Sequence, residues 1–144
     1  MTRRTERGSA LVELSWLGIL LLVPLLWIVV SVFEVQRGAF AVSGAARAAG
    51  RAFALAPDDA TGRARAEAAA RQALADQGVE DQPLFLRIAC DEPDCHAPGA
   101  VVTVRIDSRV DLPLLPSALG GGAPSFALDA THTIPIGRYR DADG

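Results

Sequence analysis

Near its N-terminus the chain carries an uninterrupted apolar segment. Between Glu13 and Glu34 lie twenty residues without a charge, residues 14–33. As an α-helix, a segment of this length rises about 30 Å, which matches the hydrocarbon core of a bilayer. The pattern therefore predicts one membrane-spanning helix.

The next segment is rich in small residues and predicts a helical stem over residues 34–55. Pro57 and the two aspartates after it end this stem, because proline disfavours helix in the preceding residue and aspartate caps helix N-termini. A second Ala-rich helix is expected over about residues 60–77, with Gly78 ending it. The two helices can form a hairpin.

Small residues recur at four-residue spacing within the stem. Ala45 and Ala49 form one such pair, and Ala46 and Gly50 form another. A face of this kind lets a second helix approach closely. That helix can belong to the same chain or to a neighbouring subunit, and the pattern alone does not choose between them.

From residue 84 onward the hydrophobic period changes from helical to alternating. Three alternating runs predict three strands, separated by a loop over residues 91–99 and by a proline- and glycine-rich connection over residues 113–124. An antiparallel sheet lying on the stem would bury their apolar positions. These positions are Leu84, Leu86, Ile88 and Cys90; Val102, Val104 and Ile106; and Phe126, Leu128, Ala130, His132 and Ile134.

The fold class expected is therefore α+β. An N-terminal transmembrane helix continues into an Ala-rich helical stem, and a second helix and a small antiparallel sheet of about three strands follow. Four regions result: a leader at 1–8, a transmembrane helix at 9–34, the stem and helix hairpin at 35–82, and a strand-rich extracytoplasmic region at 83–144. A chain of 144 residues holds one small domain.

Charge and motif content disfavour two classes of function. The formal net charge is −3, and residues 1–8 carry three arginines and one glutamate, so the chain after them has a charge of −5. This acidic remainder has no basic stripe with interleaved aromatics, and nucleic-acid binding is not expected. The sequence has no Gly-rich phosphate loop, zincin pattern or nucleophile elbow, so neither an enzyme nor a cofactor is expected.

The charges that flank the apolar segment predict its orientation. Arg3, Arg4 and Arg7 precede it, whereas Glu34 and a single Arg37 follow it. The positive-inside rule keeps such an N-terminus in the cytoplasm and places the rest of the chain outside. A cleaved signal peptide also starts basic, but its apolar core is about 7–15 residues long and ends at a small-x-small site. The longer segment here favours a permanent single-pass anchor.

Glu13 lies at the entrance of this segment, where a lipid-facing carboxylate is unfavourable and is usually paired, extended to the interface or functional. One interpretation is that Glu13 only marks the boundary and lies among the headgroups. The other starts from Gly8, five residues earlier. Cleavage after Gly8 would free the amine of Ser9, and a carboxylate just over one turn further along would be available to a neighbouring subunit.

This combination resembles the type IV prepilin signature: a short basic leader ending in glycine, a glutamate as the fifth residue after it, and a continuous apolar helix. Within that superfamily the chain is most similar to the TadE-like pseudopilins of tight-adherence (Flp) pilus systems. It departs from Flp major pilins, which are much shorter and have an aromatic where Leu14 stands. The shared features are Arg7-Gly8-Ser9-Ala10 with Val12-Glu13, Pro24 within the apolar helix, the Ala/Arg-rich residues 45–53, and a closing Pro135-Ile136-Gly137-Arg138-Tyr139-Arg140.

The resemblance implies that a membrane aspartyl prepilin peptidase cuts between Gly8 and Ser9 on the cytoplasmic face of the inner membrane. It assigns to Glu13 the neutralisation of the N-terminal amine of an adjacent subunit during assembly. The partners implied are the peptidase, other pilin or pseudopilin subunits, the pilus assembly platform and the membrane. The competing interpretation is a generic single-span anchor displaying a binding or secretion-accessory domain, which needs neither Gly8 nor Glu13.

The two cysteines, Cys90 and Cys95, flank the expected hairpin loop. An oxidising extracytoplasmic compartment favours their pairing as a disulfide. The alternative is a metal site with the adjacent His96 and with His132 from another strand, although this spacing is not a standard zinc pattern. His132 occupies an apolar-facing strand position, where a packed, hydrogen-bonded histidine is the usual role.

Overall fold

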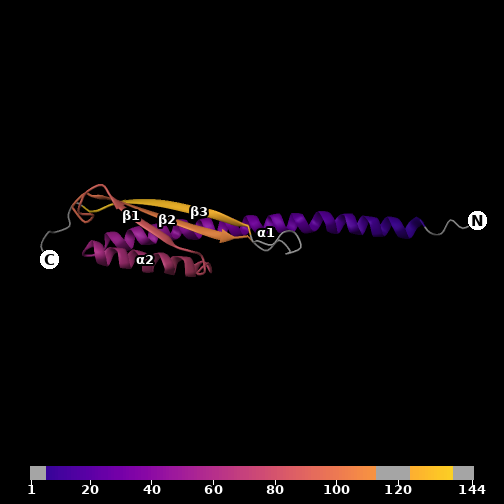
Figure 1. Cartoon of the computed structure of the whole chain (residues 1–144), viewed down its shortest axis with the longest axis horizontal. Coiled ribbons are helices and arrows are strands. Elements are labelled where there is room, and N and C mark those ends of the chain that lie inside the picture. Colours follow the sequence, from indigo (N-terminus) through magenta and orange to yellow (C-terminus); the bar gives the residue numbers. More distant parts are fainter. Residues whose placement is uncertain (1–5, 113–123, 138–144) are drawn as a thin grey trace, which may run out of the picture.

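The structure, a computed structural model, describes residues 6–112 and 124–137. In Figure 1 α1 is one long helix, and α2 and the sheet gather around its C-terminal half while its N-terminal half extends alone. Two helices followed by a three-stranded antiparallel sheet confirm the predicted α+β class. The elements are α1 (Glu6–Ala54), α2 (Asp59–Asp76), β1 (Phe85–Cys90), β2 (Val101–Asp111) and β3 (Ser125–Pro135).

Helix α1 contains both the apolar segment and the Ala-rich stem, which the sequence predicted to be continuous. It runs for 49 residues, about 74 Å at the rise of an α-helix, and passes through the expected boundary at residues 34 and 35. Pro24 lies inside it without ending it; a proline removes one backbone donor there. The expected transmembrane helix and the expected stem are therefore one continuous element.

Helix α2 has a defined signal at each end. The Asp58 side chain accepts a hydrogen bond of 2.8 Å from the backbone N–H of Thr61 and one of 2.9 Å from its hydroxyl. These two bonds hold the pKa of Asp58 below its ordinary value. At the other end Gly78 has a φ of 66°, and Val79 N–H donates to the carbonyl of Leu74. This is the Schellman arrangement that glycine favours, and it confirms Gly78 as the end of the helix.

In the sheet β2 is the central strand, antiparallel to both neighbours. Its residues alternate strictly: Val102, Val104, Ile106, Ser108 and Val110 are buried, and the residues between them are exposed or half-buried. Because side chains alternate across a strand, one face packs on α1 and the other meets solvent. The strand continues five residues past Ile106, further than the expected apolar run, since alternation persists through Ser108 and Val110.

The small residues of the stem are buried in contacts within the same chain. Ala45, Ala46, Ala49 and Gly50 are all buried by the rest of the molecule. A Cβ placed on Gly50 would stand 3.0 Å from His132 Cδ2, so the glycine permits close packing of α1 against β3. Intramolecular packing is therefore the role of this face.

Some predictions lie outside the described residues. They concern the first five residues of the leader, with Arg3 and Arg4, the connection at 113–123, and the closing residues 138–140. The neighbouring loop, which joins β1 to β2, is described and is the hairpin loop that the sequence predicts.

Candidate functional site

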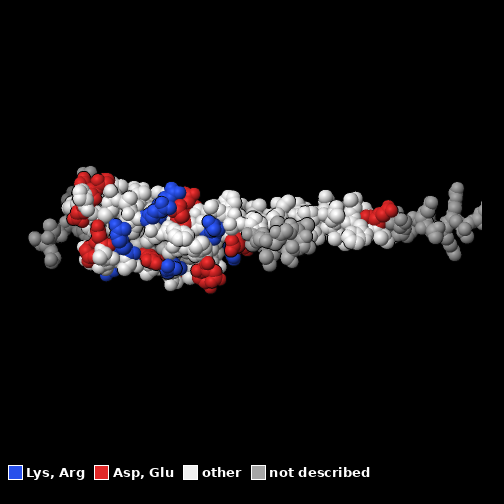
Figure 2. Space-filling view, in the orientation of Figure 1, with Lys and Arg blue, Asp and Glu red and all other residues white. Residues whose placement is uncertain are grey.

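The apolar half of α1, defined here as residues 11–33, is the largest exposed apolar surface in the described part of the chain. Its large apolar side chains are exposed, and only 6% of its most apolar 18-residue window is buried. A core helix of a water-soluble protein is instead mostly buried. Figure 2 shows this half as a nearly uncharged rod, whereas Arg, Asp and Glu cover the other end. By length and composition, α1 can cross a membrane once.

The polar side chains within this half make local hydrogen bonds. Ser15 Oγ donates to the carbonyl of Leu11 at 2.8 Å, and Ser31 Oγ donates to the carbonyl of Trp27 at 2.8 Å. In hydrocarbon, a hydroxyl without a partner is costly. Bonds to the preceding turn of the same helix satisfy these serines without any other chain.

The residues of the expected cleavage and pairing site lie together at the start of α1. Gly8 and Ser9 fall in its first turn, and Glu13 lies exposed four residues beyond Ser9. Residues four apart occupy one helix face at about 5–6 Å between Cβ atoms. The Glu13 carboxylate therefore shares a face with the backbone nitrogen that cleavage after Gly8 would release.

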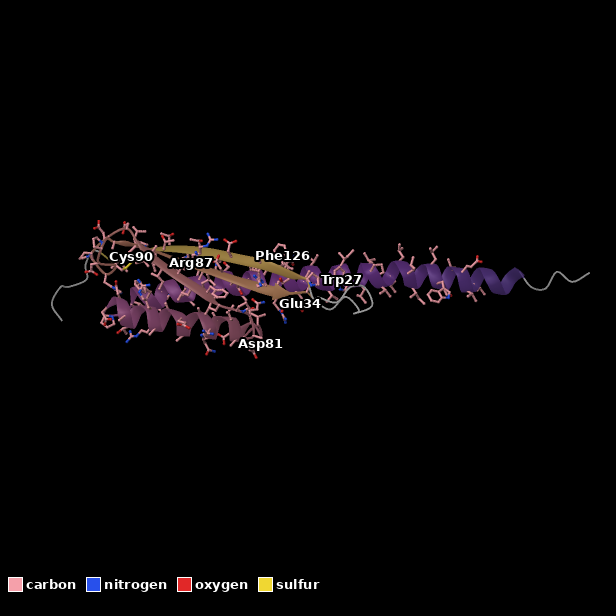
Figure 3. The ribbon with its side chains drawn as sticks, viewed as in Figure 1. Trp27, Glu34, Asp81, Arg87, Cys90 and Phe126 are labelled. Carbon is pink, nitrogen blue, oxygen red and sulfur yellow. A yellow bond between two sulfur atoms is a disulfide. The ribbon has the colours of Figure 1, made fainter. Side chains whose placement is uncertain are left out.

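At the opposite end of the molecule Cys90 and Cys95 form a disulfide, with their Cα atoms 5.4 Å apart. This confirms the predicted pairing and removes both thiols as metal ligands. Figure 3 places Cys90 at the end of the sheet furthest from the apolar half of α1. The bond closes the base of the β1–β2 loop, and Cys95 itself is buried.

The disulfide positions a cluster that the sequence did not predict. The His96 side chain is only 8% exposed; its Nδ1 lies 2.7 Å from Asp59 Oδ1, and its Nε2 lies 3.1 Å from the carbonyl oxygen of Phe53. The ring also stacks on Phe53, with centroids 4.9 Å apart. The Phe53 carbonyl can only accept, so Nε2 carries a proton. Asp59 and the Phe53 carbonyl therefore hold the two ring nitrogens of His96.

His96 therefore joins three elements: the end of α1, the start of α2 and the β1–β2 loop. The Asp94 side chain fixes this loop by accepting a 2.9 Å hydrogen bond from the His96 N–H. Ligand atoms of Asp59, Asp94 and His96 lie within 4.8 Å of one another and could hold a metal ion. Both ring nitrogens already have partners, however, and no buried side-chain polar atom in the described part of the chain lacks one. The geometry is that of a structural joint.

His132 belongs to a different environment. It is half-buried on β3, opposite Val104 of β2, and packs near Gly50. The structure therefore does not bring His96, His132, Cys90 and Cys95 together as a metal site. His96 has partners on α1 and α2, His132 packs under the sheet, and the cysteines bond each other.

Comparison of the chain with family models, with curated proteins and with solved structures finds no match. A functional assignment therefore rests on the residues of this chain.

Proposed function

We propose that the chain is a TadE-like pseudopilin, a membrane-anchored minor subunit or assembly factor of a tight-adherence pilus. The observation that supports this most directly is the spacing of Gly8, Ser9 and Glu13 at the beginning of α1, immediately before the uncharged residues 14–33. A simple anchor requires an apolar helix but not a glycine and a glutamate at these two positions.

The proposed topology has the N-terminus in the cytoplasm and the head outside. The head is defined here as α2, the sheet and residues 34–54 of α1. The arginines before the apolar half and the weaker basic character after it support this orientation. The Cys90–Cys95 disulfide supports it too, because disulfides persist in oxidising compartments.

In this proposal a prepilin peptidase cuts after Gly8 and leaves Ser9 as the mature N-terminus. The new amine is cationic near neutral pH and lies close to the membrane, where an opposite charge stabilises it strongly. Glu13 supplies that charge to the amine of an adjacent subunit. Because one carboxylate and one amine are offered by each copy, the contact can repeat from subunit to subunit.

Intact-mass analysis of membrane-extracted protein tests the cleavage. The expected species lacks residues 1–8, and Gly8→Val should retain them because a branched side chain blocks approach to the scissile bond. Gly18→Val is the matched control: a Cβ on Gly18 meets nothing within 4 Å, so this variant should be cut normally. A native N-terminus at Met1 or Thr2 in cells that contain the peptidase would contradict the proposal.

Charge removal at Glu13 tests the assembly role. Glu13→Gln keeps the size of the side chain and deletes its charge, so insertion and cleavage should persist while crosslinking to neighbouring subunits and piliation fall. Glu13→Asp should be less damaging, since it keeps the charge with a shorter reach. If Glu13→Gln leaves pili and crosslinks unchanged, the carboxylate is a boundary residue and the generic-anchor interpretation is favoured.

A further inference from the structure

The packing of β3 on α1 fixes which part of the sheet lies beside which turn of the helix. A Cβ on Gly38 would stand 2.8 Å from Leu128 Cδ1, and one on Gly50 would stand 3.7 Å from Ile134 Cγ2. Strand and helix therefore run in the same direction. The two spacings agree, since six strand residues and twelve helix residues each cover about 18–20 Å.

This register places the first residues of β3 beside the outer end of the apolar half of α1. Phe126 precedes Leu128 by two residues, about 7 Å along the strand, which corresponds to between four and five residues of helix before Gly38. Phe126 is then level with Phe33 and Glu34. Figure 3 agrees: Phe126 lies near the level of Glu34, with Trp27 further toward the N-terminus.

The same level is where the uncharged part of α1 ends. Phe33 is the last residue before Glu34, and Glu34 forms an ion pair of 2.8 Å with Arg37. If α1 crosses a bilayer, its outer interface falls at this turn, because charged side chains are excluded from hydrocarbon but accepted among headgroups. An aromatic side chain of the sheet is thus held at the depth that aromatic belts occupy.

We propose that the membrane-proximal edge of the head, formed by Phe126 and Arg109, contacts the phospholipid interface together with Phe33, the last residue of the apolar half. Phe126 is 51% exposed and Phe33 is exposed on α1, so both rings can enter the boundary between acyl chains and headgroups. Arg109 stands exposed on β2 opposite Ala127, one residue from the partner of Phe126. Its long side chain can reach lipid phosphates.

The charges at this edge set the depth of the contact. Asp111 is exposed and pairs with Ser125, the first residue of β3. A carboxylate here keeps the strand ends among the headgroups rather than in the acyl chains. The head therefore rests on the outer leaflet and is held there by more than its covalent link to α1. This inference depends on the membrane span of α1 and is independent of a pilus role.

Depth-dependent quenching of tryptophan emission tests the contact. The full chain carries Trp16→Phe and Trp27→Phe together with Phe126→Trp, and it is reconstituted in phosphatidylcholine vesicles with a nitroxide on the headgroup, at acyl carbon 5 or at acyl carbon 12. We expect Phe126→Trp to be quenched several-fold more by the headgroup and carbon-5 labels than by the carbon-12 label.

Leu55→Trp in the same background is the matched control. Leu55 is also exposed, but it lies 22 residues beyond Phe33, about 33 Å along the axis, so none of the three lipids should quench it. Quenching of Phe126→Trp as weak as that of Leu55→Trp would overturn the inference. Protection of Phe126→Trp from both the lipid labels and aqueous acrylamide would also overturn it, because a second protein copy would then cover the edge.

A third variant separates this inference from the anchor itself. The chain with Trp16→Phe alone retains Trp27, which the carbon-12 label should quench if α1 spans the bilayer. Quenching of Trp27 without quenching of Phe126→Trp removes the interface contact and leaves the proposed anchor intact. Thermal unfolding followed by circular dichroism should be the same in all variants, so that differences in quenching report position.

Discussion

The two halves of α1 are equally helical but differ in what surrounds them. In the apolar half the side chains are large, mostly Leu, Val and Ile, and they are exposed; from Ala41 to Phe53 the inward side chains are mostly alanine and fully buried. Large side chains suit a lipid environment that needs no close approach of backbones, whereas alanine lets α2 and the sheet come near. The size of the apolar side chains therefore differs between the half that can cross a membrane and the half that forms a core.

Replacing one phenylalanine in each half of α1 by alanine should give the largest difference in the stability of the head. Phe53 is 0% exposed and Phe33 is 66% exposed on the same helix. Phe53→Ala should destabilise the head by about 3–5 kcal/mol because it leaves a cavity and removes the ring that stacks on His96. Phe33→Ala should leave the stability of the head unchanged. Urea unfolding of detergent-solubilised protein, monitored by hydrogen exchange of the β2 amides, measures the stability of the head in both variants. Equal losses of stability would contradict the difference between the two halves.

Most of the fold is predictable from the sequence because its signals are local. The uncharged segment, the change from helical to alternating period, the aspartate cap at Asp58 and the glycine at Gly78 each act within a few residues. Helix boundaries differ by about one residue from those expected: α2 begins at Asp59 and ends at Asp76. The continuity of α1 across residue 34 was also predictable, since no helix-ending residue interrupts it there.

The contacts around the disulfide also divide into those that are local in sequence, which were predictable, and those that are distant in sequence, which were not. Cys90 and Cys95 are close in sequence, and their pairing was predictable. His96 lies 37 residues from Asp59 and 43 from Phe53, and only the packing of the β1–β2 loop against both helices brings them together. The sequence offered a cysteine-adjacent histidine and two aspartates at a helix start, but nothing in their spacing linked them. The position of Phe126 along α1 likewise depends on close packing at Gly38, which no pattern marked, and at Gly50, whose small-residue pattern did not identify β3 as its neighbour.

Replacing a glycine in each half of α1 by leucine should give a stability difference of intermediate size. Gly50 is buried and a Cβ there would stand 3.0 Å from His132, whereas a Cβ on Gly18 meets nothing within 4 Å. Gly50→Leu should therefore overpack the contact with β3 and destabilise the head by about 1–3 kcal/mol. Gly18→Leu gains the same helix propensity without a clash, so it serves as the matched control. The thermal midpoint of the head should fall only for Gly50→Leu, and unchanged midpoints for both would show that α1 and β3 can separate freely.

The outer face of the sheet differs from the apolar half of α1 in charge. Asp107 on β2 forms ion pairs with Arg87 of β1 and with Arg105, the latter at 3.1 Å, while Arg105 also reaches Asp129 at 3.4 Å. These side chains are partly or largely exposed, so each pair contributes little and salt weakens it.

The smallest predicted effect is the pH dependence of this charged face. Partial desolvation alone raises the pKa of Asp107, but hydrogen bonds from Arg105 and Arg87 and their positive charges outweigh it, so the pKa lies below its ordinary 3.8. A carboxyl with a lowered pKa in the folded state stabilises the fold above its unfolded-state value, and this contribution is lost as pH falls through the lower, folded-state value. At low salt, the parent should therefore be slightly more stable than Asp107→Asn near neutral pH, and the difference should shrink as the solution is acidified below about pH 4. Asp129→Asn, whose contact is longer and more exposed, should show a smaller difference. A gap between parent and Asp107→Asn that stays constant from neutral to strongly acidic pH would mean that the ion pairs of the outer face do not stabilise the head.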